Sequence, residues 1–240
     1  MIPLFRKEIS SFFSSIAGYV VVSVFLLSTG LFLWVLPGPL NIIQSGYATL
    51  DNFFITAPWL FLLLVPAVTM RLFAEEKTSA TLEWLLTKPL SEMEIILAKY
   101  FAGITLVLLS LIPCLLYFFT VYLLGNPPGN IDTGATWGSF TGLFLLAATY
   151  TAIGIFSSAA AGNQVVALIL AVILCLFFYL GFDYVASFLT ASKGASEWGI
   201  NYHYESLSRG VIDSRDLVYF FSCIALFIYS TQFFLQKRKW

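Results

Sequence analysis

Histidine, cysteine and charge are all scarce in this sequence, and each scarcity removes a class of function. The single histidine, His203, excludes an H-E-x-x-H motif and any cluster of histidine ligands within one chain. The three cysteines, Cys114, Cys175 and Cys223, lie inside apolar segments, where a thiol behaves as a small hydrophobic side chain. We therefore expect no disulfide and no metal site. A formal net charge of −1 gives no indication of a nucleic-acid partner.

Catalytic and nucleotide-binding motifs are missing as well. No G-x-x-x-x-G-K-[ST] sequence occurs, so the chain lacks the backbone loop that cradles the phosphates of ATP. No G-x-S-x-G sequence occurs either. Glu75 and Glu76 resemble the start of an E-E-x-x-x-R protease motif, but Ala80 stands at the arginine position. The sequence predicts a protein that is not an enzyme and holds no cofactor. If the protein uses energy from ATP, another polypeptide must hydrolyse the ATP.

Long apolar runs are what the sequence has in abundance. Hydrophobic residues make up 59% of the chain and charged residues 10%, whereas soluble domains average about 45–50% and about 25%. An α-helix needs about 20 apolar residues to cross a hydrocarbon core of about 30 Å. Six runs qualify, at about 17–36, 53–70, 100–124, 137–156, 165–184 and 217–234. The predicted fold is an all-α polytopic membrane protein, with residues 1–240 as one transmembrane domain and the first run as a retained span.

Lysine and arginine indicate the orientation of these spans, because cytoplasmic loops carry an excess of both. Nine of the twelve basic residues fall at the two termini or between spans two and three. The remaining three, Lys193, Arg209 and Arg215, fall in connections on the opposite side. We therefore expect both termini in the cytoplasm.

The first residues show a helical pattern of their own before span one. Phe5, Ile9, Phe12, Phe13 and Ile16 share one face of a helix. This spacing predicts an interfacial helix over residues 3–16, lying in the cytoplasmic leaflet. The alternative is that these residues simply extend span one.

One charged segment, 71–95, separates spans two and three. Its first part, RLFAEEKTSATLEWLLTKPLS, holds six formally charged residues. The residue before Pro89 disfavours the α region, so a first helix should end there. Ser91 and Glu94 then form the pattern of a capping box, with serine at the N-cap and glutamate at N3. The segment is predicted to be two helical pieces joined by a proline corner, although a solvated connector would also satisfy the topology.

The residue order in this segment resembles a known family. Phe73, Glu76, Lys77, Thr81-Leu82-Glu83, Leu85-Leu86 and Pro89 follow the F-x-x-E-[KR]-x-x-G-T-L-E-x-L-L-x-x-P pattern of ABC-2-type transporter permeases, and Lys99 follows at a matching distance. One departure is Ala80, which stands where the family has glycine. Alanine favours helix over glycine by about 1 kcal/mol, so we expect continuous helix at this position.

The resemblance implies what the segment does. In that family it is the coupling helix, which sits in a groove of a separate ATPase subunit carrying the ATP and magnesium. The implied coupling residues are Glu76, Lys77, Thr81, Leu82, Glu83, Leu85, Leu86 and Pro89. Leu82, Leu85 and Leu86 would form the docking face, and Glu76 and Glu83 would make polar contacts. The other implied partners are the lipid bilayer and a second permease copy or a homologous membrane subunit with an outer domain.

Four stretches narrow the resemblance to the gliding-motility-associated (Gld-type) ABC transporter permeases: 57–61, 66–71, 86–89 and 203–216. That group implies an exporter-like complex in the bacterial inner membrane, whose cargo does not follow from the sequence. The runner-up is a non-transporting scaffold that uses the same ATPase to drive or regulate an envelope machine, and a membrane enzyme ranks third.

The last outer connection, 185–216, carries a further candidate site. His203, Glu205, Arg209 and Asp213 lie close together in the sequence and would form an outer gate that exchanges salt bridges. An ordinary hydrated loop explains the same spacing. Asp213 also precedes span six at the position of a helix N-cap.

Overall fold

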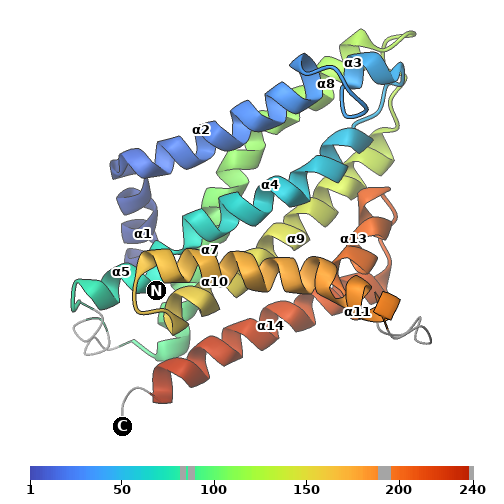
Figure 1. Ribbon diagram of the computed structural model, residues 1–240. Helices are drawn as coiled ribbons and strands as arrows, with labels where there is room; N and C mark the ends of the chain where they lie inside the picture. The colour runs from blue at the N-terminus through green and yellow to red at the C-terminus, as the bar shows by residue number, and fades with distance from the viewer. Residues whose placement is uncertain (82–84, 86–89, 189–195, 238–240) are drawn as a thin grey trace.

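The computed structural model describes residues 1–81, 85, 90–188 and 196–237 (Figure 1), and all regular structure within these ranges is helical. The helices of the first half are α1 (Ile2–Ser14), α2 (Ile16–Gly30) with its π-helical end Leu31–Val35, α3 (Ile42–Ser45), α4 (Asp51–Thr69), α5 (Arg71–Thr78), α7 (Glu92–Leu111) and α8 (Leu115–Leu124). Those of the second half are α9 (Thr133–Ala160), α10 (Gln164–Leu176), α11 (Phe182–Phe188), α13 (Ile200–Ser208) and α14 (Ser214–Lys237). A turn of 3-10 helix, Ile112–Cys114, joins α7 to α8, and a π-helical turn, Phe177–Gly181, joins α10 to α11.

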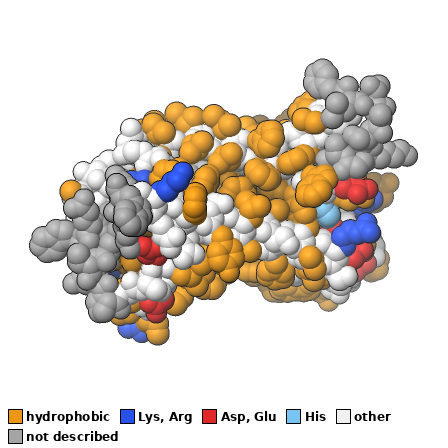
Figure 2. All heavy atoms as spheres, turned by 90° about the horizontal axis from the view of Figure 1, so that it is seen from below, with side chains coloured by type: hydrophobic (Ala, Val, Ile, Leu, Met, Phe, Trp, Pro, Cys, Tyr) orange, Lys and Arg blue, Asp and Glu red, His pale blue; other side chains and the backbone are white. Residues whose placement is uncertain are grey.

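Within the described residues, six helices are long and apolar enough to cross a membrane. They span Ile16–Val35, Asp51–Thr78, Glu92–Leu124, Thr133–Ala160, Gln164–Ser187 and Ser214–Lys237, and each overlaps one of the six expected runs. Figure 2 shows a face whose middle is largely hydrophobic, with charged side chains gathered toward its two ends. This distribution is what a bilayer requires, because apolar side chains face lipid and charges stay near water. The prediction of an all-α polytopic fold is confirmed.

Helix α9 is the centre of the bundle. It packs against α4, α7, α10, α13 and α14, and 83% of its most apolar stretch is buried, against 22% for the first span. Small residues make this possible: a Cβ added at Gly142 would lie 2.5 Å from Leu207 Cβ in α13, and one at Gly154 would collide with Thr69 in α4. Glycines at these positions therefore allow α9 to approach α4 and α13 closely.

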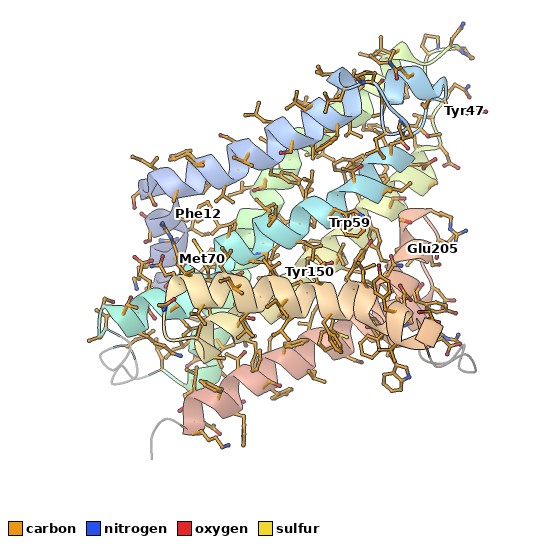
Figure 3. All side chains as sticks on the ribbon, viewed as in Figure 1. Phe12, Tyr47, Trp59, Met70, Tyr150 and Glu205 are labelled. Carbon is orange, nitrogen blue, oxygen red and sulfur yellow. The ribbon has the colours of Figure 1, made fainter. Side chains whose placement is uncertain are left out.

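Both described ends of the chain lie at the same end of the bundle. Figure 1 shows α1, α5 and the end of α14 together there, while α3, α11 and α13 occupy the opposite end. The side chains labelled in Figure 3 follow this order, with Phe12 and Met70 near one end and Tyr47 and Glu205 near the other. The segment between the second and third spans therefore shares its end of the bundle with the N-terminal helix.

Helix α1 is separate from the first span. Ser15 adopts an extended conformation between α1 and α2, and the chain turns sharply there (Figure 1). Gly18 allows the turn to close, because a Cβ at this position would lie 2.5 Å from the Phe12 carbonyl oxygen. The interpretation of residues 3–16 as an extension of span one is therefore wrong, and a distinct N-terminal helix is confirmed.

Candidate functional site

Helix α5 continues from the second span, and its first turn is held by α9. The Ser158 hydroxyl of α9 accepts hydrogen bonds from Phe73 N and Ala74 N, each at 3.0 Å, and donates to Met70 O at 2.9 Å. The first amides of a helix have no partner within it. A side chain from another span thus takes the place of a local N-cap and fixes where α5 begins.

The last turn of α5 is fastened to α9 by Lys77. Its ammonium donates to Ala159 O and to Ala161 O, the latter at 3.0 Å, and lies 5.4 Å from the centre of the Phe234 ring in α14. These carbonyls stand at the C-terminus of α9, where a helix carries partial negative charge. Lys77 therefore caps α9 while it holds α5 against the bundle.

Four charged residues, Lys7, Glu8, Glu76 and Lys99, form a network that joins α1, α5 and α7. Lys99 is fully buried, and its Nζ lies 2.8 Å from Glu8 Oε1, 3.0 Å from Glu76 Oε2 and 2.5 Å from Leu72 O. Lys7 Nζ lies 2.8 Å from Glu76 Oε1 and 3.7 Å from Glu8 Oε1. The Lys99–Glu76 contact is ionic only, because Glu76 Oε2 lacks a partner with hydrogen-bond geometry. This four-charge network has equal numbers of positive and negative charges.

The two positive and two negative charges of this buried network offset each other. A buried charge left without its partner destabilises a protein strongly, whereas a complete pair costs little. Burial lowers the pKa of Lys7, but its hydrogen bond and charge interaction with Glu76, together with Glu8, outweigh this and raise the pKa above that of a free lysine. Because the pKa is raised, the stabilisation is fully present at neutral pH. It is lost only as the pH rises through the folded-state pKa.

The C-terminus of α5 corrects the expectation of continuous helix at Ala80. Ala80 has a φ of +55°, and α5 ends at Thr78, well before the proline corner. Ala80 N donates to Lys77 O at 3.2 Å and Thr81 N to Glu76 O at 2.9 Å, which are the two hydrogen bonds of a Schellman motif. The closing bonds of the turn outweigh the helix preference of alanine, and the motif explains why glycine suits this position.

The predicted coupling residues fall into three groups. Leu82, Glu83, Leu86 and Pro89 lie outside the described residues. Thr81 is exposed, and Leu85 is half-buried against the core. Glu76 and Lys77 point into the bundle, and Glu76 is only 7% exposed. A direct contact of Glu76 with a partner stays a prediction, and its placement favours an internal role instead.

The start of the third span agrees with the sequence pattern. Ser91 accepts a hydrogen bond from Glu94 N at 3.3 Å, and the Glu94 carboxylate accepts one from Ser91 N at 2.9 Å. These reciprocal bonds confirm the predicted capping box at the N-terminus of α7. The third span thus begins at a fixed residue, close to the four-charge network.

The outer connection is not a loop at residues 200–208 but the docked helix α13. Tyr204 donates to Phe54 O at 2.8 Å, and Ser139 donates to Ser208 O at 2.8 Å. Burial raises the pKa of the Tyr204 hydroxyl well above its ordinary value, so this donor keeps its proton. Helix α13 therefore closes this end of the bundle by close contact with α4 and α9.

The structure does not bring His203, Glu205, Arg209 and Asp213 together as one cluster. His203 is buried and lies 2.7 Å from Asp216 Oδ1, with its ring stacked on Tyr219. Glu205 and Arg209 form an exposed pair at 3.3 Å. Asp213 accepts from Arg215 N at 2.9 Å, as expected of the N-cap. The grouping fails because one helix directs His203 inward and the pair outward.

Sequence reasoning missed several residues of these sites, among them Lys7, Glu8, Ser158 and Asp216. Glu8 stands between Leu4 and Phe12 on the buried side of α1. An acidic residue on the apolar face of a helix was the signal that could have indicated a buried ion pair. The sequence gives no such signal for Ser158, because serine is common in membrane spans. Among the described residues, no group of three or more His, Cys, Asp and Glu side chains is arranged to hold a metal ion.

The fold of the described residues is that of a polytopic membrane protein with six membrane-length helices. A short polar helix, α5, lies between the second and third of them, at one end of the bundle. Residues 41–209, more than half of the chain, match the family described as ABC-2 family transporter protein. The chain therefore belongs to this family, whose members are generally non-catalytic permease subunits that typically work with an ATPase subunit. A comparison with curated proteins finds no match.

Proposed function

We propose that this chain is the permease subunit of an ABC exporter, and that a separate ATPase binds α5 and the segment that follows it. Family membership supports the first part, and the resemblance of 73–89 to a coupling helix supports the second. Two ATPase subunits that close on ATP and magnesium would push on this surface. The gliding-motility-associated (Gld-type) permease group is the subtype that we propose, in the bacterial inner membrane.

The observation that carries this proposal is the number of directions in which α5 is held. Ser158 and Lys77 attach it to α9, Lys99 attaches it to α7, and Lys7 attaches it to α1. Hydrogen bonds and ion pairs are directional, so they hold one helix in register with another. A push on α5 would therefore pass to the second and third spans and to the central helix, instead of being absorbed by a loose connection.

The positions of the basic residues support a cytoplasmic location for this end. Lys7, Arg71, Lys77, Lys99 and Lys237 all lie there in the described structure, as the positive-inside rule requires of the cytoplasmic side. A second permease copy, or a homologous membrane subunit, would complete the transport path.

Co-purification with the ATPase subunit tests the docking. Leu82→Asp and Glu83→Lys should each lower the amount of ATPase recovered with the permease by about thirtyfold, since hot-spot contacts contribute about 2 kcal/mol or more. Glu205→Lys, a charge reversal at the opposite end, is the matched control and should leave recovery unchanged. Membrane insertion must be equal for all three variants. Recovery equal to wild type with both docking variants would refute the proposal.

A further inference from the structure

A charged cavity of about 210 Å³ lies beside the four-charge network, between α1 and α5. Phe12, Val68, Leu72 and Leu106 supply its apolar wall, and its rim includes Lys7, Glu8, Arg71, Glu75 and Ser79. Helix α1 is amphipathic and lies at one end of the bundle of spans, which is typical of helices that lie among lipid headgroups. The cavity thus combines charge of both signs with apolar surface at one end of the spans.

Two opposite charges in this cavity do not pair with each other. Arg71 and Glu75 both line it and stand four residues apart on α5, a spacing at which such residues ordinarily interact. Arg71 donates to the Ser15 hydroxyl at 2.7 Å, and within the described residues neither side chain joins an ion pair. Glu205 and Arg209, with the same spacing at the other end, do pair. The unpaired charges are complementary to a ligand that carries both signs.

An apolar groove begins one helical turn from the cavity. It has a volume of about 180 Å³ and runs between α2 and α4, lined by residues that include Val20, Val24, Leu63 and Leu64. Leu64 in the groove and Val68 in the cavity are four residues apart, on one face of α4. The groove therefore lies about one helical turn from the cavity, within reach of an acyl chain whose charged head occupies the cavity.

We propose that this site binds an aminophospholipid, a diacyl lipid whose headgroup carries a phosphate and a primary ammonium. The phosphate would lie against the Arg71 guanidinium, which can donate two parallel hydrogen bonds. The ammonium would donate to the Glu75 carboxylate, and one acyl chain would occupy the groove between α2 and α4. A trimethylammonium headgroup has no N–H to donate, so the site distinguishes phosphatidylethanolamine from phosphatidylcholine. The site shares α5 with the ATPase contact proposed above, but the choice of lipid does not depend on that contact.

Native mass spectrometry of the full-length chain, offered equal amounts of the two lipids, tests the headgroup. Wild type should retain the ethanolamine lipid about tenfold over the choline lipid, the ratio expected of one charge-assisted hydrogen bond. Glu75→Gln should bring the ratio near one without loss of the choline lipid, whereas Arg71→Gln should lower retention of both. Glu205→Gln and Arg209→Gln are the matched controls. Wild-type ratios in both cavity variants, at an unchanged melting temperature, would overturn the proposal.

The groove is tested separately. Val24→Trp should fill it and lower retention of both lipids, while Val218→Trp, on the exposed face of α14, should not. Glycerophosphoethanolamine, which has the headgroup without acyl chains, should fail to displace the bound lipid. Displacement by this soluble molecule as effective as that by a short-chain diacyl lipid would mean that the ligand is not a membrane lipid. Equal retention by Val24→Trp and wild type would likewise overturn the assignment of the groove.

Discussion

The two ends of the bundle hold their short helices in different ways. At one end, the four-charge network, Lys77 and Ser158 fasten α5 with ion pairs and hydrogen bonds to three other helices. At the other end, α13 rests on the glycines of α9, with the buried His203–Asp216 pair beside it. Ion pairs and hydrogen bonds hold the short helix in place at the first end, and close backbone packing holds it in place at the second.

This contrast indicates how each end should respond to force or mutation. A buried ion pair fails as a unit, because removal of one charge leaves its partner unpaired in a region of low dielectric. Close packing around glycine fails locally, because an added Cβ displaces only the neighbour that it meets. The end with α5 is thus built to hold a fixed arrangement among several helices, and the end with α13 to close the bundle.

Loss of the Lys99 charge should break the first arrangement and have the largest effect. Lys99→Met leaves Glu8 and Glu76 without their buried partner, and we expect the stability to fall by about 3–5 kcal/mol. Thermal unfolding of the detergent-purified protein measures the loss, and hydrogen exchange should rise in α1 and α5 but not in α13.

Two further variants make that result specific. Lys237→Met, the same change at an exposed position of α14, should unfold like wild type. The triple variant Glu8→Gln, Glu76→Gln, Lys99→Met removes the unpaired charges and should recover part of the stability. An unfolding temperature for Lys99→Met equal to that of Lys237→Met would contradict a stabilising network.

The spans and the end of the bundle where α5 lies follow from the sequence, but the network does not. Apolar run length predicts each span, and the Ser91–Glu94 pattern predicts where α7 begins, because both signals are local. Lys7 pairs with Glu76, and Glu8 with Lys99, across long stretches of sequence. No local pattern in one sequence predicts which of these distant residues pair with each other. The expectation of continuous helix at Ala80 is wrong for a different reason, since backbone hydrogen bonds to Glu76 and Lys77 outweigh the helix preference of one residue.

A methyl group at Gly142 should loosen the packing of α13 without changing how α5 is held at the other end of the bundle. The added Cβ would lie 2.5 Å from Leu207 Cβ, and overpacking of this kind costs about 1–3 kcal/mol. Gly142→Ala should therefore lower the unfolding temperature and speed hydrogen exchange in α13 alone.

Gly134→Ala supplies the matched control in the same helix. Its Cβ would meet only Asp132 Oδ1 at 3.5 Å, an ordinary contact, so it reports the gain in helix propensity without the clash. Faster exchange in α5 upon Gly142→Ala would show that the two ends are coupled more closely than their contacts indicate.

Ala80→Gly should have the smallest effect and the opposite sign. Ala80 holds a left-handed conformation at a φ of +55°, which costs an alanine roughly 1 kcal/mol and a glycine almost nothing. The substitution keeps both closing hydrogen bonds of the turn, because they use backbone atoms only, and it should stabilise the protein by about 1 kcal/mol in thermal unfolding. Ala225→Gly, inside α14, should instead destabilise it by a similar amount, since glycine disfavours a helix interior. If both substitutions destabilise the protein, Ala80 is not at the end of α5 in a Schellman turn, and the proposed docking through the segment after α5 must be revised.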